Sequence, residues 1–196
     1  IIALMGSSGT SKTTLLNTLA QRQSVGKVSG EILIDGARLG PEFQRSAGFC
    51  EQMDIQEGSP TIREALELSA LLRQKRAIPR KDKITYVNSI IHLLELGDLQ
   101  HAIISSLSLK RRKQGTIGVE LATKPSILFF LDEPTSGLDS QSAFSSVRFL
   151  RKLSDLGLAI ICTIHQPSFG LIEQFDMILA INHGGRSFYF APIGAN

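Results

Sequence analysis

A loop rich in glycine and serine follows the first apolar residues and constrains the fold more than any other segment. Residues 1–5 form a short apolar stretch, residues 6–11 read Gly-Ser-Ser-Gly-Thr-Ser, and a helical pattern with leucines on one face runs over residues 12–21. This order predicts a strand, a loop and a helix in direct succession. Strand-like and helix-like segments alternate further along the chain, which indicates an α/β fold with a mostly parallel sheet covered by helices on both faces.

Hydrophobic periodicity and turn residues place the other elements. Helices are expected over residues 59–72, 83–96, 110–122 and 140–156, with Gly97 and Gly157 at C-terminal caps and Ser59 or Thr61 at an N-cap. Strands are expected at 126–131, 158–163, 177–181 and 187–190. Strands at 30–36 and 46–51 are assigned to a small antiparallel sheet. The predicted domain spans residues 1–196, with a helical lobe over about 61–121.

Composition excludes several classes of protein. With 42% hydrophobic and 20% charged residues, the 196-residue chain is expected to fold as a globule. A net charge of +3 is too small to indicate a nucleic-acid partner. Cys50 and Cys162 lie in apolar surroundings, which predicts buried thiols and a reducing, cytosolic setting. No apolar stretch approaches the roughly 20 residues that span a bilayer. Because Ile1 falls inside a strand, we expect a fragment of a longer protein.

The loop after the first strand resembles a P-loop. In such a loop, backbone N–H groups and a helix N-terminus surround phosphate oxygens, a lysine neutralises charge and a hydroxyl holds Mg²⁺. The residues expected to bind nucleotide in this way are Gly6, Ser7, Ser8, Gly9, Thr10, Ser11, Lys12, Thr13 and Thr14, with Thr13 as the Mg²⁺ ligand. The strict pattern has glycine before the lysine, where this chain has Ser11. If that position requires a positive φ, serine costs about 1–3 kcal/mol of strain. A plain glycine and serine turn is the alternative.

Two carboxylates follow an apolar strand at residues 127–131. Asp132 and Glu133 would be costly at the end of a buried strand unless a metal or a donor pairs with them. Mg²⁺ at the phosphate loop would supply this partner. Asp132 is then expected to hold the metal, directly or through water, and Glu133 to act as the general base on the attacking water. The alternative is an acidic loop after a core strand.

With both elements present, the chain resembles the nucleotide-binding domain of an ATP-binding cassette (ABC) transporter. Residues 135–139 (TSGLD) resemble the family's D-loop, residues 162–168 (CTIHQPS) its H-loop, and residues 48–52 (GFCEQ) its Q-loop, all in the family's order. The strings FLDEPTSGLDS and TIHQPS point to the G subfamily and to its fungal pleiotropic drug resistance transporters. The chain is most similar to the second, C-terminal cassette of those proteins, truncated at its N-terminus.

The resemblance implies roles for four further residues. His165 would sense the γ-phosphate and position Glu133, and Gln52 would contact Mg²⁺ and communicate with the membrane domain. Asp139 would face the opposing cassette, and Ser108 would reach the nucleotide bound there. The first three residues also have ordinary structural interpretations: His165 as a core histidine, Gln52 as a surface glutamine and Asp139 as a helix N-cap.

The signature loop departs from the family pattern Leu-Ser-Gly-Gly-Gln. Residues 107–111 read Leu-Ser-Leu-Lys-Arg, so Ser108 remains and both glycines are lost. The basic run at residues 110–113 lies at a helix start, where the helix dipole disfavours cations. We interpret these basic residues as solvent-exposed rather than as a nucleic-acid-binding patch. The segment 102–108 is expected to be several residues shorter than in the family. In the family the aromatic residue that stacks on adenine lies upstream of the phosphate loop, so we expect this fragment to lack it.

The function implied by the resemblance is ATP binding and hydrolysis, with ATP and Mg²⁺, that powers export of hydrophobic compounds or lipids. The implied partners are a second cassette, arranged head to tail, and the transmembrane domains of a parent transporter, with no nucleic acid. The implied location is the cytosolic face of the plasma membrane. One alternative is a catalytically impaired fragment that binds nucleotide without turnover. Another is a soluble ABC ATPase that acts in translation or DNA repair.

Overall fold

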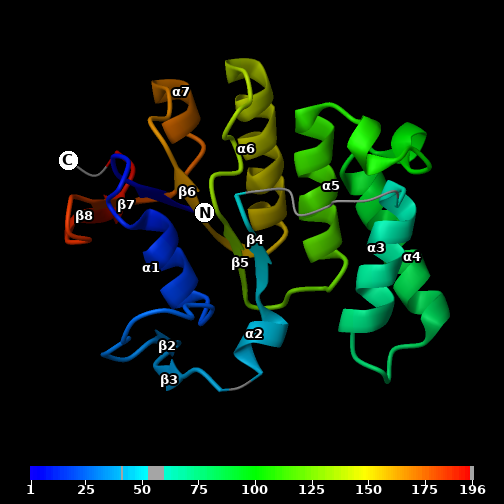
Figure 1. Cartoon of the computed structure of the whole chain (residues 1–196), viewed down its shortest axis with the longest axis horizontal. Helices are drawn as coiled ribbons and strands as arrows, with labels where there is room; N and C mark the ends of the chain where they lie inside the picture. Colours follow the sequence, from blue (N-terminus) through cyan, green and yellow to red (C-terminus); the bar gives the residue numbers. More distant parts are fainter. Residues whose placement is uncertain (41, 53–59, 195–196) are drawn as a thin grey trace.

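A computed structural model describes residues 1–40, 42–52 and 60–194 (Figure 1). Within these residues the main sheet has six strands. In spatial order they are β4 (Gly48–Cys50), β5 (Leu128–Leu131), β6 (Ala159–Ile164), β1 (Ile2–Met5), β7 (Met177–Ile181) and β8 (Ser187–Pro192). All neighbours are parallel except β7 and β8. The predicted mostly parallel sheet is confirmed.

The small antiparallel sheet is a hairpin of β2 (Leu33–Ile34) and β3 (Ala37–Arg38). Its turn residues Asp35 and Gly36 both have positive φ, 49° and 77°, as a type I′ turn requires. The assignment of residues 46–51 to this sheet is wrong, because β4 pairs with β5 in the main sheet. All three β4 residues are buried, as expected for a strand of a parallel sheet that is covered on both faces.

The long helices form close to their predicted positions. They are α1 (Lys12–Leu19), α3 (Ile62–Arg73), α4 (Arg80–Leu93), α5 (Leu109–Leu121) and α6 (Ser140–Asp155). The prediction missed two one-turn helices, α2 (Phe43–Ser46) and α7 (Phe169–Ile172), and the 3₁₀ turns at Gly97–Leu99 and Ile104–Ser106. Segments this short carry too little periodicity to be recognised in a sequence.

The helix ends follow the capping signals in part. Thr61 caps α3 in a capping box with Glu64, whereas Ser59 lies outside the described residues. Gly157 follows α6 with a φ of 98°. The assignment of Gly97 as the cap of α4 is wrong, because α4 ends at Leu93 and Glu95 takes the left-handed conformation with a φ of 55°.

The core lies on both faces of the sheet. Successive side chains of a strand point to opposite faces, so Phe129 and Phe130 of β5 enter different clusters. Phe129 packs in the larger cluster, with α3, α4, α5 and α6, and Phe130 packs with α1, α2 and β4. The helices α3, α4 and α5 lie together at one end of the molecule, as the predicted helical lobe requires (Figure 1).

Both cysteines are buried, as predicted. Burial in β6 raises the pKa of the Cys162 thiol to about 12, because the apolar surroundings disfavour the thiolate. Among the described residues, no helix has the length and apolar composition needed to cross a bilayer.

Candidate functional site

Four of the segments singled out by the sequence meet at one edge of the main sheet. The loop at residues 6–11 follows β1, Asp132 follows β5, His165 follows β6, and Gln52 lies two residues beyond β4. These strands are parallel neighbours in the order β4, β5, β6, β1. Their carboxyl ends therefore lie side by side, at the edge where ligands bind in open α/β sheets.

The phosphate loop is compact and requires glycine at its first position. A Cβ on Gly6 would lie 2.5 Å from Oγ1 of Thr10 and 2.6 Å from the carbonyl oxygen of Ile181. Thr10 is fully buried, and its hydroxyl donates to the Ser7 carbonyl at 2.8 Å. Gly9 has a φ of 78°. The loop geometry is thus fixed by its own backbone and by the neighbouring strand β7.

Ser11 has left-handed backbone angles, with φ 68° and ψ 29°, at the N-cap of α1. The positive φ that the sequence left conditional for this position is therefore present. The left-handed conformation costs a residue with a Cβ roughly 1–2 kcal/mol, and the Ser11 side chain makes no capping hydrogen bond that would offset this cost. Loop strain is therefore stored directly beside the lysine.

Lys12 is buried and folds back over the loop. Its ammonium donates to the Gly6 carbonyl at 2.9 Å and to the Ser7 carbonyl at 3.1 Å. Thr13 and Thr14 are exposed in the first turn of α1. The loop therefore combines a fixed cation, exposed hydroxyls and the N-terminus of a helix, a combination that suits phosphate.

Asp132 and Glu133 are linked by a residue that the sequence analysis missed. The Thr163 hydroxyl donates to Oδ1 of Asp132 at 2.6 Å and accepts from the backbone N–H of Glu133 at 2.7 Å. Asp132 and Thr163 are buried and Glu133 is half-buried, with a φ of 47°. Thr163 was detectable as a hydroxyl near the end of an otherwise apolar strand. It gives the buried carboxylate a donor within the protein.

Two side-chain contacts join the segments across the site. Nε2 of Gln52 donates to Oε2 of Glu133 at 2.8 Å, and Nε2 of His165 lies 3.3 Å from the Ser8 hydroxyl. Gln52 comes from the β4 side and His165 from the end of β6. Gln52, predicted to contact Mg²⁺, thus bonds Glu133, whereas His165, predicted to position Glu133, lies against the phosphate loop instead.

Ser108 and Asp139 lie apart from this cluster. Asp139 is exposed and caps α6 by accepting from the backbone N–H of Ser142 at 2.9 Å. This hydrogen bond lowers the pKa of the Asp139 carboxyl. Ser108 occupies the N-cap of α5 without a side-chain capping bond. No hydrogen bond between described residues joins either side chain to the phosphate loop.

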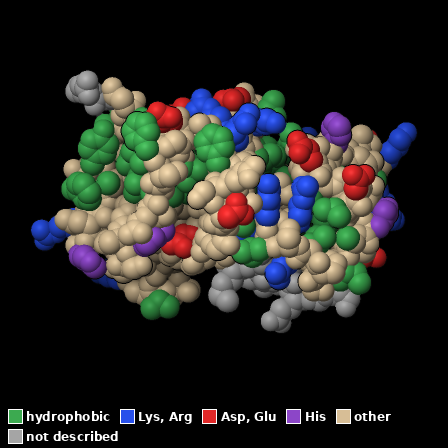
Figure 2. Space-filling view, turned by 90° about the horizontal axis from the view of Figure 1, so that it is seen from above, with side chains coloured by type: hydrophobic (Ala, Val, Ile, Leu, Met, Phe, Trp, Pro, Cys, Tyr) green, Lys and Arg blue, Asp and Glu red, His purple; other side chains and the backbone are tan. Residues whose placement is uncertain are grey.

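Basic side chains gather beside Ser108, at the start of α5. Lys110 and Arg111 line a cavity of about 250 Å³ together with Arg148 and Lys152 of α6. Figure 2 shows Lys and Arg side chains over this part of the molecule, whereas hydrophobic side chains gather over β7 and β8. Further along α5, the Lys113 ammonium lies 3.5 Å from the carbonyl oxygen of Glu133.

The predicted Mg²⁺ ligands are Thr13, Gln52 and Asp132. They offer a hydroxyl, an amide carbonyl and a carboxylate, which are the oxygen donors that Mg²⁺ accepts where phosphates and water complete its coordination. Across residues 1–40, 42–52 and 60–194, no three His, Cys, Asp or Glu side chains form a metal cluster. By donor chemistry, the hydroxyl, amide and carboxylate suit Mg²⁺ that is held jointly with a phosphate ligand.

Comparison with known proteins identifies the family. The sequence profile described as ABC transporter matches residues 1–136. The chain belongs to the ABC transporter family. The ABC multidrug transporter atrF of Aspergillus flavus is 67% identical over 194 residues, which cover 99% of the chain and 13% of that relative. The brefeldin A resistance protein of Schizosaccharomyces pombe is 54% identical over 198 residues, which cover 99% of this chain and 13% of that relative.

The chain therefore spans about an eighth of the length of these ABC relatives. Their names agree with the expected pleiotropic drug resistance type. Solved structures show the same fold: cbiO1 from Clostridium perfringens has a TM-score of 0.84 at 22% identity, covering 97% of this chain and 76% of its own. A dimeric bacterial ABC transporter cassette has a TM-score of 0.81 at 21% identity, and the match covers 100% of this chain and 86% of that cassette. The predicted ABC cassette fold is confirmed.

Proposed function

We propose that this ABC domain binds Mg²⁺-ATP at residues 6–14 and hydrolyses it at Glu133. The observation that carries the proposal is the convergence of four strand ends at one edge, with Gln52 bonded to Glu133 and His165 beside Ser8. These contacts connect residues far apart in the chain. Their arrangement matches what phosphoryl transfer to water requires: a phosphate cradle, a carboxylate base and polar groups that hold both.

Each residue then has a chemical role. Lys12 and the loop amides neutralise charge on the phosphate oxygens, and Thr13, Gln52 and Asp132 hold Mg²⁺, which supplies further charge neutralisation when bound. Glu133 accepts a proton from the attacking water. Its Oε2 already accepts from Gln52, which leaves Oε1 to bind that water. His165 holds the γ-phosphate end of the loop through its place beside Ser8.

Hydrolysis is proposed to drive export by a longer membrane transporter. Support comes from relatives named as multidrug transporters and from the fraction of their length that this chain spans. In this proposal a second cassette closes head to tail on the site, bringing Ser108 and Asp139 of each chain toward the other's nucleotide. The transmembrane domains move hydrophobic compounds or lipids across the plasma membrane, with the cassette on its cytosolic face.

A domain that binds nucleotide without turnover is a second candidate, which the multidrug-transporter relatives do not favour. Ser11 is held in a left-handed conformation beside Lys12, and the signature loop has Leu109 and Lys110 in place of its glycines. The signature-loop change bears on hydrolysis more directly than on binding, because that loop is proposed to act on nucleotide held by the opposing cassette.

Calorimetry with Mg²⁺-ATP and the shift in melting temperature test the proposal. The chain should bind, Lys12→Ala should lose binding, and Lys27→Ala, which changes an exposed lysine away from the loop, should not. Circular dichroism checks that each variant folds. Turnover by the wild-type chain that Glu133→Gln abolishes would establish hydrolysis. Binding without turnover would favour the second candidate, and absence of binding in the folded chain would overturn both.

A further inference from the structure

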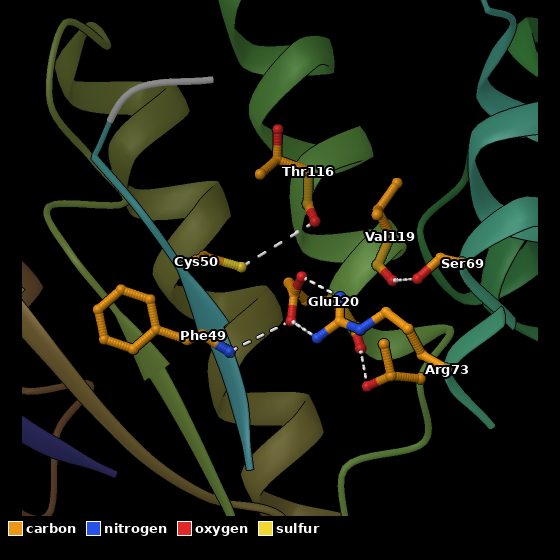
Figure 3. A network of polar contacts seen from close by, with 8 residues as sticks. Phe49, Cys50, Ser69, Arg73, Thr116, Val119 and Glu120 are labelled. Atoms are coloured by element: carbon orange, nitrogen blue, oxygen red, sulfur yellow. Dashed lines mark hydrogen bonds and ion pairs between the residues drawn. The ribbon is translucent and has the colours of Figure 1, made fainter. Parts of the chain in front are cut away.

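Glu120 of α5 connects three elements through one carboxylate (Figure 3). Its Oε1 accepts from Nη1 of Arg73 at 2.5 Å, and its Oε2 accepts from Nη2 of Arg73 at 3.0 Å. The same Oε2 accepts from the backbone N–H of Phe49 at 3.3 Å. Arg73 belongs to the last turn of α3 and Phe49 to the middle of β4. The carboxylate therefore joins the helical lobe to the edge of the main sheet.

The contact with Phe49 follows from the position of β4 at the edge of the sheet. Along a strand, successive residues direct their backbone groups to opposite sides. The Cys50 carbonyl accepts from Asp132 on the β5 side, so the N–H of Phe49 points away from β5. No strand lies on that side of β4 within the described residues. Glu120 supplies the acceptor that the sheet does not provide.

The carboxylate is well placed to hold β4 firmly. Its side chain is 14% exposed, so the charge is largely shielded from water and depends on its donors. The bidentate pairing with Arg73 fixes the plane of the carboxylate, and therefore the direction in which Oε2 faces Phe49. Ser69 of α3 adds a second tie between the helices, because its hydroxyl donates to the Val119 carbonyl at 2.8 Å.

The held strand leads directly to the site. Gln52 lies three residues beyond Phe49 and donates to Glu133 at 2.8 Å. Between them, the Cys50 thiol lies 4.0 Å from the Thr116 carbonyl of α5 (Figure 3). The direction in which β4 leaves the sheet therefore sets where the Gln52 amide stands relative to the glutamate.

We propose that Glu120 is a positioning residue for hydrolysis, which holds β4 against the helical lobe so that Gln52 keeps its hydrogen bond to Glu133. The inference rests on the proposed function. It makes the Arg73–Glu120 pair the link through which a shift of the helical lobe reaches the catalytic glutamate.

A double-mutant cycle with Gln52 tests the proposal in steady-state ATP hydrolysis. Glu120→Ala should lower kcat about 10- to 100-fold with KM nearly unchanged, because the base loses its alignment while the phosphate loop is untouched. Glu120→Gln, which keeps an acceptor for Phe49, should recover part of the rate. In a Gln52→Ala background, Glu120→Ala should have no further effect. Equal losses of kcat in both backgrounds would overturn the proposal.

A matched control separates positioning from stability. Glu67→Ala removes another partly buried carboxylate of the helical lobe, which pairs with Arg63 at 3.0 Å within α3 and makes no hydrogen bond or ion pair with the described residues of β4. Melting temperatures record the stability loss of each variant. If Glu67→Ala lowers kcat as much as Glu120→Ala at a comparable melting temperature, the effect of Glu120 is structural and the proposal fails.

An NMR measurement keeps the inference testable without turnover. The side-chain amide resonances of Gln52 are recorded in the wild-type chain and in Glu133→Ala, which defines the position without the hydrogen bond. Glu120→Ala should move these resonances toward the Glu133→Ala position, and Glu67→Ala should leave them in place. If the chain shows no turnover but the Gln52 resonances shift as predicted, hydrolysis is rejected while the positioning of Gln52 by Glu120 is supported. If the resonances do not move in Glu120→Ala, the positioning role of Glu120 is overturned.

Discussion

The Thr163 hydroxyl donates to Oδ1 of Asp132 at 2.6 Å and also accepts from the backbone N–H of Glu133. One hydroxyl on β6 thus holds both carboxylate residues that follow β5. The neighbouring strand therefore fixes the metal-binding and base positions proposed here before any ligand binds, which is the preorganisation that an electrostatic site requires.

Thr163→Val should destabilise the chain. The substitution keeps the side-chain shape but leaves the buried Asp132 carboxylate without this donor, at a cost of about 1–3 kcal/mol. Urea unfolding measures the difference. Thr85→Val is the control, because the exposed Thr85 hydroxyl donates only to the Lys81 carbonyl of its own helix. Equal stability of Thr163→Val and the wild-type chain would show that Asp132 needs no donor from β6.

Ser11→Gly should stabilise the chain. Glycine tolerates the φ of 68° without a Cβ penalty, and after its larger unfolded-state entropy is subtracted the gain is about 0.5–1 kcal/mol. Ser7→Gly is the matched control, since Ser7 is in the same loop but has no positive φ, and it should be neutral or destabilising. Thermal unfolding compares the two variants. A loss of stability in Ser11→Gly would show that the serine side chain contributes more than its strain costs.

The stability contributed by the Asp139 cap should depend on pH. The pKa of its carboxyl is lowered below the ordinary value of 3.8, mainly because the carboxylate accepts from the Ser142 backbone N–H. The contribution is therefore complete above that ordinary value and is lost as pH falls through the lowered pKa. Asp139→Asn should match the wild-type midpoint of urea unfolding near neutral pH, since both residues cap helices well. It should lose less stability than the wild-type chain on acidification. If the unfolding stabilities of the wild-type chain and Asp139→Asn fell equally with pH, the Asp139 carboxylate would not be the source of this pH dependence.

The sequence allowed the main architecture to be predicted because its signals are local. The phosphate loop, the strand before Asp132 and the long helices each carry a periodic pattern or a turn signal within a few residues. The placement of β4 failed for a non-local reason. Its three residues are compatible with either sheet, and only packing decides. A Cβ on Gly48 would lie 2.4 Å from the Phe129 ring, so glycine allows this close approach to β5.

The site was predictable in its residue types but less so in its connections. The carboxylate pair after an apolar strand indicated Glu133, the family resemblance supplied Gln52 and His165, and the structure places all three at one edge. Thr163 and Glu120 were missed because their roles depend on partners 31 and 71 positions away, Asp132 and Phe49. The Thr163 hydroxyl stands out in its apolar strand, but neither it nor a glutamate in a helix indicates in the sequence which distant residue it contacts.

His165→Ala should lower kcat for ATP hydrolysis by about 100-fold or more while leaving Mg²⁺-ATP affinity nearly unchanged. The reason is that Nε2 of His165 lies 3.3 Å from the Ser8 hydroxyl, where we propose that it contacts the γ-phosphate, whereas Lys12 and the loop amides are proposed to provide the ground-state binding. His92→Ala, which changes an exposed histidine of α4, is the control and should retain full activity. Calorimetry and steady-state turnover separate the two effects. Normal hydrolysis by His165→Ala would return His165 to a structural role, and lost binding would place it in the phosphate cradle itself.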